Sequence, residues 1–370
     1  MSEQKIFMAT ENYIEINDFL KDNRVKKLFL VCDASIEYLN VNSYFVDLGK
    51  KAETEIIKFN DFSSNPTYES VVKGVSLFNS EKCDAIIAVG GGSSIDVAKC
   101  VKLYSNMNHN ENYLHQKIIP NEIPFLAMPT TAGTGSESTR FAVIYYNEKK
   151  QSITDESIIP DTVILDSSTL NTLPLYHKKS TLFDAFCHAI ESFWSVNSTD
   201  ESKEYSKKAI KLIMDNMDGY IANDSQANTN MFIAANMAGK AINISQTTAG
   251  HAMCYKITSL FGVAHGHAAA LVDRKLWTWM IDNIDKCTDK RGPEYLKTVF
   301  DDIAVAMNCE NAKSAAQKFN HIFDDFGLSV PKASDDEYEI LKSSVNPERL
   351  NNNPIKLDTK IIDELYHIIL

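Results

Sequence analysis

Four side chains, one aspartate and three histidines, have the composition of a metal site. Asp184 and His188 lie four residues apart in TLFDAFCHAIESFW, so a helix places both on one face, one turn apart. His251 and His265 occur in GHAMCYKITSLFGVAHGH, where one helix and the turn after it can direct both imidazoles inward. Three imidazoles and a carboxylate suit Fe²⁺ or Zn²⁺. The pattern predicts a divalent metal with an open coordination position.

The alternative is that these are ordinary core residues, because a lone histidine on an apolar helix seldom binds metal. Against it, the segment around Asp184 is apolar at Leu182, Phe183, Phe186, Ile190, Phe193 and Trp194. A carboxylate and an imidazole buried in such a segment need partners. A shared ion satisfies both.

Two loops have the residues that bind a dinucleotide. GGGSSIDVAK follows the apolar run DAIIAV, and its glycines (90–92), with Ser93 or Ser94 at the helix start, allow close approach of a phosphate. A plain strand-to-helix turn is the alternative, and the spacing is not G-x-G-x-x-G. MPTTAGTGSES follows the run IPFLAM and supplies hydroxyls for pyrophosphate and ribose. Both loops should lie at the carboxyl edge of one parallel sheet.

An acidic residue, Asp33, ends the first apolar run and suits the adenosine ribose hydroxyls. It would repel a 2′-phosphate, which favours NAD(H) over NADP(H). The other interpretation is that Asp33 only caps a turn.

The order of apolar runs predicts an α/β domain followed by an all-helical one. Strands are expected at 27–33, 54–59, 84–89, 123–128, 141–146 and 162–165, with a helix over 67–78. From Pro174 onward the chain shows helical periodicity only. We therefore expect an N-terminal α/β dinucleotide-binding domain over 1–173 and an all-helical metal-binding and substrate domain over 174–370, with a ligand pocket between them.

Composition narrows the class of partner. The 370 residues carry a net charge of −12 and no basic run interleaved with aromatics, which argues against nucleic acid. No secretion signal or membrane span is evident, and seven scattered cysteines fit reduced thiols. We expect a cytoplasmic protein with a small-molecule substrate.

Together these residues resemble the iron-containing (group III) alcohol dehydrogenase family. The resemblance covers about Lys27 to Asp273 and rests on GGGSSIDVAK, PTTAGTGSE, PDTVILD, DAFCHAIES and GHAM…AHGH. It implies the family's architecture, shared with dehydroquinate synthase, and hydride transfer between NAD(P)H and a carbonyl or alcohol. It implies a homodimer and an Fe²⁺ or Zn²⁺ ion on Asp184, His188, His251 and His265. For the cofactor it implies the following residues: Asp33, Gly91, Gly92, Ser93, Ser94, Asp96, Thr130, Thr131, Thr134 and Lys150.

Two departures from the family pattern stand out. Many members have a histidine and a proline where this chain has Tyr255 and Lys256, so the proton donor is expected to be Tyr255, His267 or water. His267 could instead only orient its neighbours. The N-terminal glycine-rich turn is also absent, so the first strands could pair differently.

The segment STRFAVIYY, with the second metal motif, resembles a subgroup typified by phosphonoacetaldehyde reductases. Arg140 and Lys256 would then bind an anionic aldehyde, reduced to 2-hydroxyethylphosphonate in the case of phosphonoacetaldehyde. Solvated surface charge is the alternative for both residues.

The sequence leaves three alternative functions. The first is a dehydrogenase of the same family acting on short-chain alcohols or lactaldehyde-like diols. A dehydroquinate synthase-like cyclase is disfavoured because its ligand set resembles Glu-His-His. A non-catalytic protein is disfavoured because the ligands and glycine loops are intact.

Overall fold

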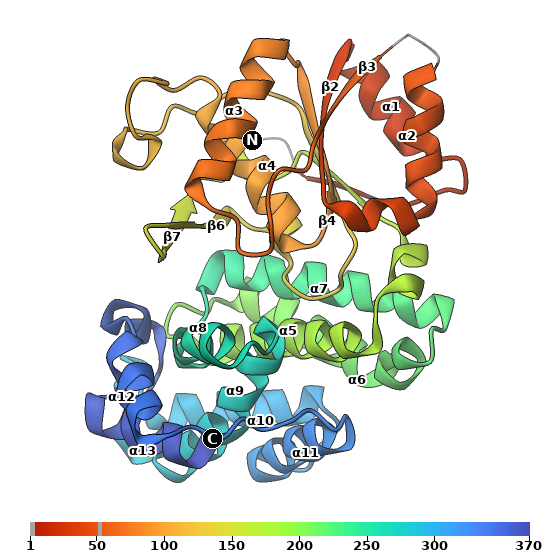
Figure 1. Ribbon diagram of the computed structural model, residues 1–370. Coiled ribbons are helices and arrows are strands. Elements are labelled where there is room, and N and C mark those ends of the chain that lie inside the picture. The colour runs from red at the N-terminus through yellow and green to blue at the C-terminus, as the bar shows by residue number, and fades with distance from the viewer. Residues whose placement is uncertain (1–3, 51–53) are drawn as a thin grey trace. The chain divides into compact units, whose positions relative to one another are not determined.

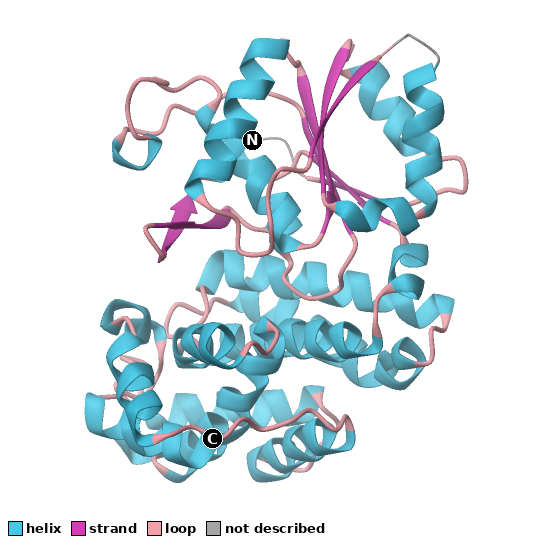
Figure 2. Cartoon of the chain, viewed as in Figure 1, coloured by secondary structure: helices cyan, strands magenta, loops and turns pink. Residues whose placement is uncertain are grey.

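The computed structural model describes residues 4–50 and 54–370. The chain divides into two compact units, Met1–Leu173 and Pro174–Leu370. Figure 2 shows that strands occur in the first unit, whereas the second is helical. Among the described residues, no helix combines the length and hydrophobicity that crossing a bilayer requires.

The first unit is built on a six-stranded parallel sheet with the order β1-β8-β5-β4-β2-β3. Its strands are β1 (Lys5–Met8), β2 (Lys27–Cys32), β3 (Glu55–Phe59), β4 (Ala85–Gly90), β5 (Phe125–Pro129) and β8 (Thr162–Leu165). The central strands β4, β5 and β8 are buried throughout and largely apolar, because both faces of the sheet are covered. The strands predicted from β2 to β5 and at β8 are present within about two residues of the expected bounds.

Helices cover the two faces of this sheet (Figure 1). They are α1 (Ile14–Asp22) and α2 (Asn40–Lys50) on one face, and α3 (Tyr68–Glu81) and α4 (Gly92–Tyr104) on the other. The alternation of β2 sends Leu28 and Leu30 toward α1 and α2, and Phe29 and Val31 toward α3 and α4. Each face thus has its own apolar core.

One predicted strand belongs elsewhere. β6 (Phe141–Tyr146) forms as expected, but it pairs antiparallel with β7 (Lys149–Thr154) in a hairpin outside the parallel sheet. Asn147 and Glu148 at the turn have φ of 49° and 60°, the left-handed pair that a two-residue hairpin requires. The prediction missed β7, which is largely polar. It also missed β1, an edge strand that pairs with β8.

The second unit consists of helices packed around α5. Its helices are α5 (Leu175–Trp194), α6 (Asp200–Ile221), α7 (Ser225–Ser245), α8 (Ala249–Phe261), α9 (His265–Asp282), α10 (Pro293–Ala306), α11 (Ala312–Asp325), α12 (Asp335–Ser344) and α13 (Thr359–Ile369). A short 3₁₀ segment, η7 (Pro347–Asn352), precedes α13. From Leu182 to Trp194 every residue of α5 is buried, because α6, α7, α9 and α10 all contact this helix. A polar side chain on α5 therefore has to find its partner inside the protein.

Candidate metal centre and nucleotide loops

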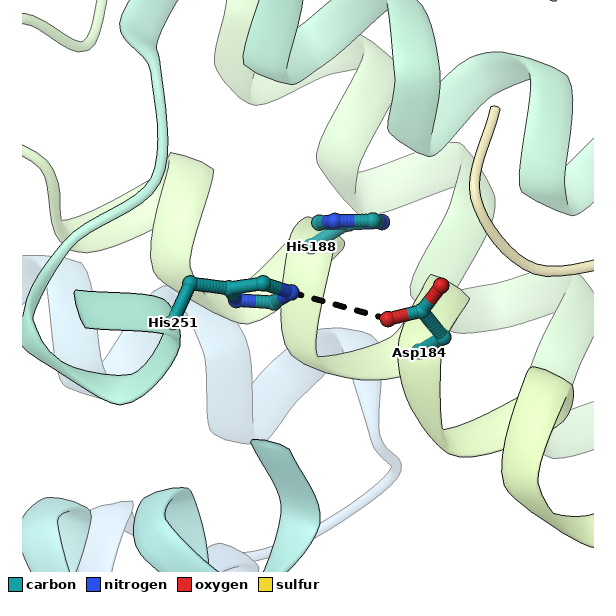
Figure 3. A group of neighbouring side chains, drawn as sticks. All are labelled: Asp184, His188 and His251. Carbon is teal, nitrogen blue, oxygen red and sulfur yellow. Dashed lines mark ion pairs between the residues drawn. The ribbon is translucent and has the colours of Figure 1, made fainter. Parts of the chain in front are cut away.

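Three helices of the second unit bring the predicted ligands together. α5 carries Asp184 and His188 one turn apart, α8 carries His251 in its first turn, and α9 begins at His265. His251 Nε2 lies 3.6 Å from Asp184 Oδ1, and His265 Nε2 lies 4.0 Å from the same oxygen. The His188 ring stacks on the His251 ring at 4.4 Å between centroids. Figure 3 shows the Asp184 carboxylate facing the His251 imidazole, with His188 alongside.

These atoms fit a divalent ion. Asp184 Oδ1 and His251 Nε2 are buried, and neither has a hydrogen-bond partner among the described residues. Ligand atoms of Asp184, His188 and His251 lie within 4.8 Å of one another. Two ligands about 2.1 Å from one tetrahedral ion are roughly 3.4 Å apart, close to the observed separations. An ion would satisfy both atoms.

The site is open on the side of His265. The His265 side chain is 37% exposed, whereas those of Asp184 and His251 are 3% and 2% exposed. A substrate can therefore approach beside His265, which is the arrangement that distinguishes catalytic from structural metal sites.

A buried carboxylate behind His251 fixes the orientation of its ring. Glu191, one turn after His188 on α5, accepts from His251 Nδ1, and its Oε2 accepts from the Thr248 amide at 2.6 Å and hydroxyl at 2.8 Å. With Nδ1 protonated, Nε2 is left for the metal. Burial lowers the pKa of His251, but Glu191 and Asp184 outweigh it and raise the pKa to about 10. The two carboxylates thus favour a positive charge at this position.

Asp273 on α9 completes this network. Its carboxyl group is fully buried near Glu191, and burial beside that charge raises the pKa of Asp273 well above its usual range. Burial also opposes ionisation of Glu191, but His251 and Thr248 lower the pKa of Glu191 to about 2. Glu191 is thus the charged member and Asp273 the protonated one.

Two glycines permit the helices to approach this closely. A Cβ on Gly250 would lie 2.0 Å from Asp273 Oδ1 and 2.7 Å from Glu191 Oε1. A Cβ on Gly266 would lie 2.0 Å from the Ser180 carbonyl oxygen. Only glycine lets α8 and α9 bring His251 and His265 toward α5.

Tyr255 lies beside His265, the partly exposed member of the predicted ligand set. Its ring stacks on that of His265, with 5.4 Å between centroids and 13° between planes. Its hydroxyl accepts a 3.1 Å hydrogen bond from Nη1 of Arg349. The predicted proton donor thus lies at the open side of the centre.

His267 is held differently. Its Nε2 lies 2.8 Å from the Ser329 carbonyl oxygen and its Nδ1 lies 3.1 Å from the Tyr176 hydroxyl. A carbonyl only accepts, so Nε2 carries the proton and Nδ1 accepts from Tyr176. The side chain is buried, and burial lowers its pKa. With both ring nitrogens engaged, His267 fits the alternative role of orienting its neighbours better than that of a proton donor.

In the first unit the two predicted nucleotide loops lie side by side. β4 and β5 are neighbours, with Gly90 opposite Pro129, and the Thr130 amide donates to the Gly90 carbonyl at 3.1 Å. The two loops are in close contact. A Cβ on Gly91 would lie 3.5 Å from Thr131 Oγ1, and a Cβ on Gly92 would lie 3.1 Å from Thr134 Oγ1. No side chain caps the start of α4, so its first amides can bind an anion.

Asp33 and Ser94 lie at the same edge of the sheet. Asp33 Oδ1 accepts from the Ser35 amide at 2.8 Å, so the residue does cap the short turn after β2. Its Oδ2 lies 3.4 Å from the Ser94 hydroxyl at the start of α4. The cap leaves a carboxylate oxygen facing the phosphate loop.

Asp96 and Lys99 of α4 organise the second loop. Asp96 accepts from the Ser136 hydroxyl at 2.6 Å and from the Val143 amide at 2.9 Å. The fully buried Lys99 ammonium donates to the carbonyls of residues 136, 139 and 141 at 2.6 to 2.7 Å. Both side chains face the protein, so Asp96 supports the loop that carries the hydroxyls predicted to bind the cofactor.

The predicted substrate cations belong to different units. Arg140 in the first unit is paired with Glu156 at 2.6 Å, which offsets its charge. Lys256 in the second unit is half-buried on α8, and its ammonium has no salt bridge among the described residues. Lys150, predicted to bind the cofactor, lies on β7. An anion-binding role is thus better supported for Lys256 than for Arg140.

Several residues of these sites were missed from the sequence. Glu191 follows His188 by three residues, a spacing that signals one helix face. Lys99 is the last residue of the GGGSSIDVAK motif. Asp273 and Arg349 carried no local signal, because helix packing alone brings them to the centre.

The sequence matches two family models. One, described as iron-containing alcohol dehydrogenase, covers residues 3–167, and the other, the C-terminal part of the Fe-containing alcohol dehydrogenase family, covers residues 179–370. The two models together span most of the chain.

Individual relatives share less than a third of their aligned residues with this chain. Aldehyde-alcohol dehydrogenase 2 of Entamoeba histolytica is 31% identical over 67% of this chain, which spans only 30% of that longer protein. Phosphonoacetaldehyde reductase of Streptomyces viridochromogenes is 28% identical over 81% of this chain and 79% of its own length. The structure of sulfoacetaldehyde reductase from Bifidobacterium kashiwanohense in complex with NAD⁺ superposes with a TM-score of 0.84 at 23% identity, covering 100% of this chain and 97% of that one.

Proposed function

Because the chain belongs to the iron-containing alcohol dehydrogenase family, we propose that it is a metal-dependent aldehyde reductase that uses NADH to reduce a small anionic aldehyde. Phosphonoacetaldehyde, reduced to 2-hydroxyethylphosphonate, is the substrate that we favour. The observation that carries the metal-dependent chemistry is the buried pair of Asp184 Oδ1 and His251 Nε2. Among the residues that the structure describes, neither atom has a hydrogen-bond partner, and both lie close to His188 and the partly exposed His265.

Each part of the reaction has residues to support it. A bound Fe²⁺ or Zn²⁺ supplies Lewis acidity for the carbonyl, and NADH supplies the hydride. Asp184, His188, His251 and His265 would hold the ion, and Glu191 keeps His251 in the tautomer that presents Nε2. Tyr255, stacked on His265, is the group best placed to deliver a proton to the product oxygen.

The cofactor would bind at the edge formed by the two loops of the first unit. The uncapped start of α4 and the hydroxyls of Thr131 and Thr134 suit pyrophosphate. The charge of Asp33 favours NADH, because a 2′-phosphate would be repelled. The preference is measured by comparing Kd values for NADH and NADPH, and equal values would contradict the role of Asp33.

His251→Ala tests the metal assignment. We expect bound metal to fall well below one equivalent and turnover to fall with it, because the variant removes one of the four proposed ligands. Full activity with stoichiometric metal would exclude the site. His321→Ala, on α11, is the matched control and should keep both.

The substrate class is tested by an anaerobic assay with phosphonoacetaldehyde, lactaldehyde, succinic semialdehyde and propanal. The proposal expects a higher kcat/KM for the anionic aldehydes. A preference for propanal or lactaldehyde would instead identify a short-chain alcohol or diol dehydrogenase. That second candidate is favoured by the pairing of Arg140 with Glu156, which removes one of the expected cations.

A further inference from the structure

A cationic side chain that belongs to no recognised motif lies beside the metal centre. Arg349 is in η7, almost one hundred residues after His251 in the chain. Its guanidinium carbon lies 5.3 Å from the centre of the Tyr255 ring, and its Nη1 donates to the Tyr255 hydroxyl at 3.1 Å. Tyr255 in turn stacks on His265, the exposed metal ligand. Only one aromatic ring therefore separates this cation from the open side of the centre.

The charge of Arg349 is not committed to a carboxylate among the side chains that the structure describes. The other arginines of the second unit differ, since Arg274 pairs with Asp324 and Arg291 with Asp289. Arg349 is half-buried, and a guanidinium has five N–H donors. The bond to Tyr255 uses one of them, so a ligand can be bound by others.

The two cations predicted from the sequence are less well placed. Arg140 is already paired with Glu156. Lys256 directly follows Tyr255 on α8, and successive helical residues point about 100° apart. Lys256 therefore leaves the helix in a different direction from the ring that stacks on His265.

We propose that Arg349 binds the anionic head group of the substrate and determines its selectivity. The proposal rests on the proposed function, because it requires an aldehyde whose carbonyl is bound at the metal. A phosphonate or sulfonate presents several oxygens, which the planar guanidinium can bind in pairs. Tyr255 fixes the position of the guanidinium through its ring and its hydroxyl.

The test compares the metal-loaded wild type with Arg349→Gln and Arg349→Lys. The first measurement is the ratio of kcat/KM for phosphonoacetaldehyde to kcat/KM for propanal. The second is the Kd of ethylphosphonate, an unreactive anion, by calorimetry. Lys297→Gln, which removes an exposed charge from α10, controls for net charge, and metal content is measured for every variant.

We expect Arg349→Gln to lower the ratio and raise the Kd by roughly tenfold to a hundredfold, with metal content unchanged. Arg349→Lys should give a ratio and a Kd between those of the wild type and Arg349→Gln, because lysine keeps the charge but lacks the paired N–H donors of the guanidinium. Unchanged ratio and Kd in Arg349→Gln would overturn the proposal. If that variant does not fold, wild-type values in Arg349→Lys would overturn it equally.

Failure of the proposed function can be distinguished from failure of the Arg349 proposal. It would appear in the wild type, as an absence of preference for any anionic aldehyde over propanal. A wild type that prefers anionic aldehydes and an Arg349→Gln variant that keeps this preference would reject Arg349 alone.

Discussion

The proposed metal ligands owe their orientation to residues behind them. Asp184 and His251 could each adopt several rotamers, but both are buried, and Glu191 accepts from His251 Nδ1. A buried ionised carboxylate is tolerated here because Thr248 donates to it twice. The proposed ligand set is therefore held in place without an ion.

Glu191→Gln should weaken metal binding by roughly tenfold to a hundredfold, because a glutamine neither fixes the tautomer nor offsets the charge of the ion. Competition with a chelator measures the affinity. Glu204→Gln, on the exposed part of α6, is the control. Unchanged affinity would mean that Glu191 is only a packing residue.

Tyr255→Phe separates stacking from proton delivery. The ring still packs on His265, so metal should be retained, whereas the loss of the hydroxyl should lower kcat by about a hundredfold or more. Steady-state kinetics and metal analysis check this. An unchanged kcat would mean that water, and not Tyr255, donates the proton. Tyr338→Phe on α12 serves as the control.

Among the elements, α4 connects the two nucleotide loops. Its N-terminus faces the phosphate loop, while Asp96 and Lys99 on its body bind the second loop and β6. The glycines alone would leave the second loop loosely held. A buried ammonium bonded to three carbonyls fixes it.

Lys99→Met should raise the Kd for NADH by about tenfold and lower the free energy of unfolding by about 2 to 4 kcal/mol, because buried carbonyls lose their donor. Lys102→Met is a matched control, since this buried lysine of α4 donates to the Ile123 carbonyl, outside the loop. It should lower stability without weakening NADH binding. NADH fluorescence and denaturant titration distinguish the two effects, and equal Kd values in both variants would contradict the role of Lys99.

Arg291, just before α10, links this segment to the turn after α5 and also forms a local ion pair whose strength depends on pH. Arg291 bonds Asp289 at 2.6 Å and also donates to the carbonyl oxygens of Ser195 and Ser198. Burial raises the pKa of Asp289, but the bonds from Arg291 outweigh it and leave the pKa below its usual value. The unfolded chain thus binds this proton more readily, so the stabilisation is present at neutral pH and is lost as the pH falls below about 4.

Asp289→Asn should lower the free energy of unfolding at pH 7 by about 2 kcal/mol. The difference from the wild type should shrink as the pH falls below about 4, because the wild-type carboxylate is then increasingly protonated. Urea denaturation at several pH values measures this. A difference that stays constant with pH would show that the pair does not contribute through its charge.

At the scale of the whole molecule, the predicted metal ion and the predicted nucleotide would bind to different units. The proposed metal ligands lie on α5, α8 and α9 of the second unit, and the predicted nucleotide loops follow β4 and β5 of the first. Each ligand should therefore stabilise its own set of elements locally.

Removing the metal with a chelator should increase hydrogen exchange in α5, α8 and the start of α9 and leave residues 85–104 nearly unchanged. NADH should do the reverse, protecting the start of α4 and residues 129–136. Exchange measured by mass spectrometry, with each ligand added separately, checks both. Metal-dependent protection of the loop after β4 without change in α8 would contradict the assignment.

The sequence by itself determined what is encoded locally. Helical spacing paired Asp184 with His188, and glycine and hydroxyl residues after apolar runs marked the two nucleotide loops, because strand, turn and helix signals act over a few residues. The change from period-two runs to helices near Pro174 predicted where the second fold type begins. Residues 141–146 were predicted as a strand correctly, but their pairing depends on a partner that had no apolar signal.

The tertiary structure decided what depends on packing between distant segments. It placed His267 between Ser329 and Tyr176, paired Arg140 with Glu156, and brought Asp273 and Arg349 to the metal centre from positions without a motif. Contacts across tens of residues follow from how helices pack, and no short pattern encodes them. The proposed metal ligands can thus be identified from the sequence, whereas the groups that surround them are brought there by the fold.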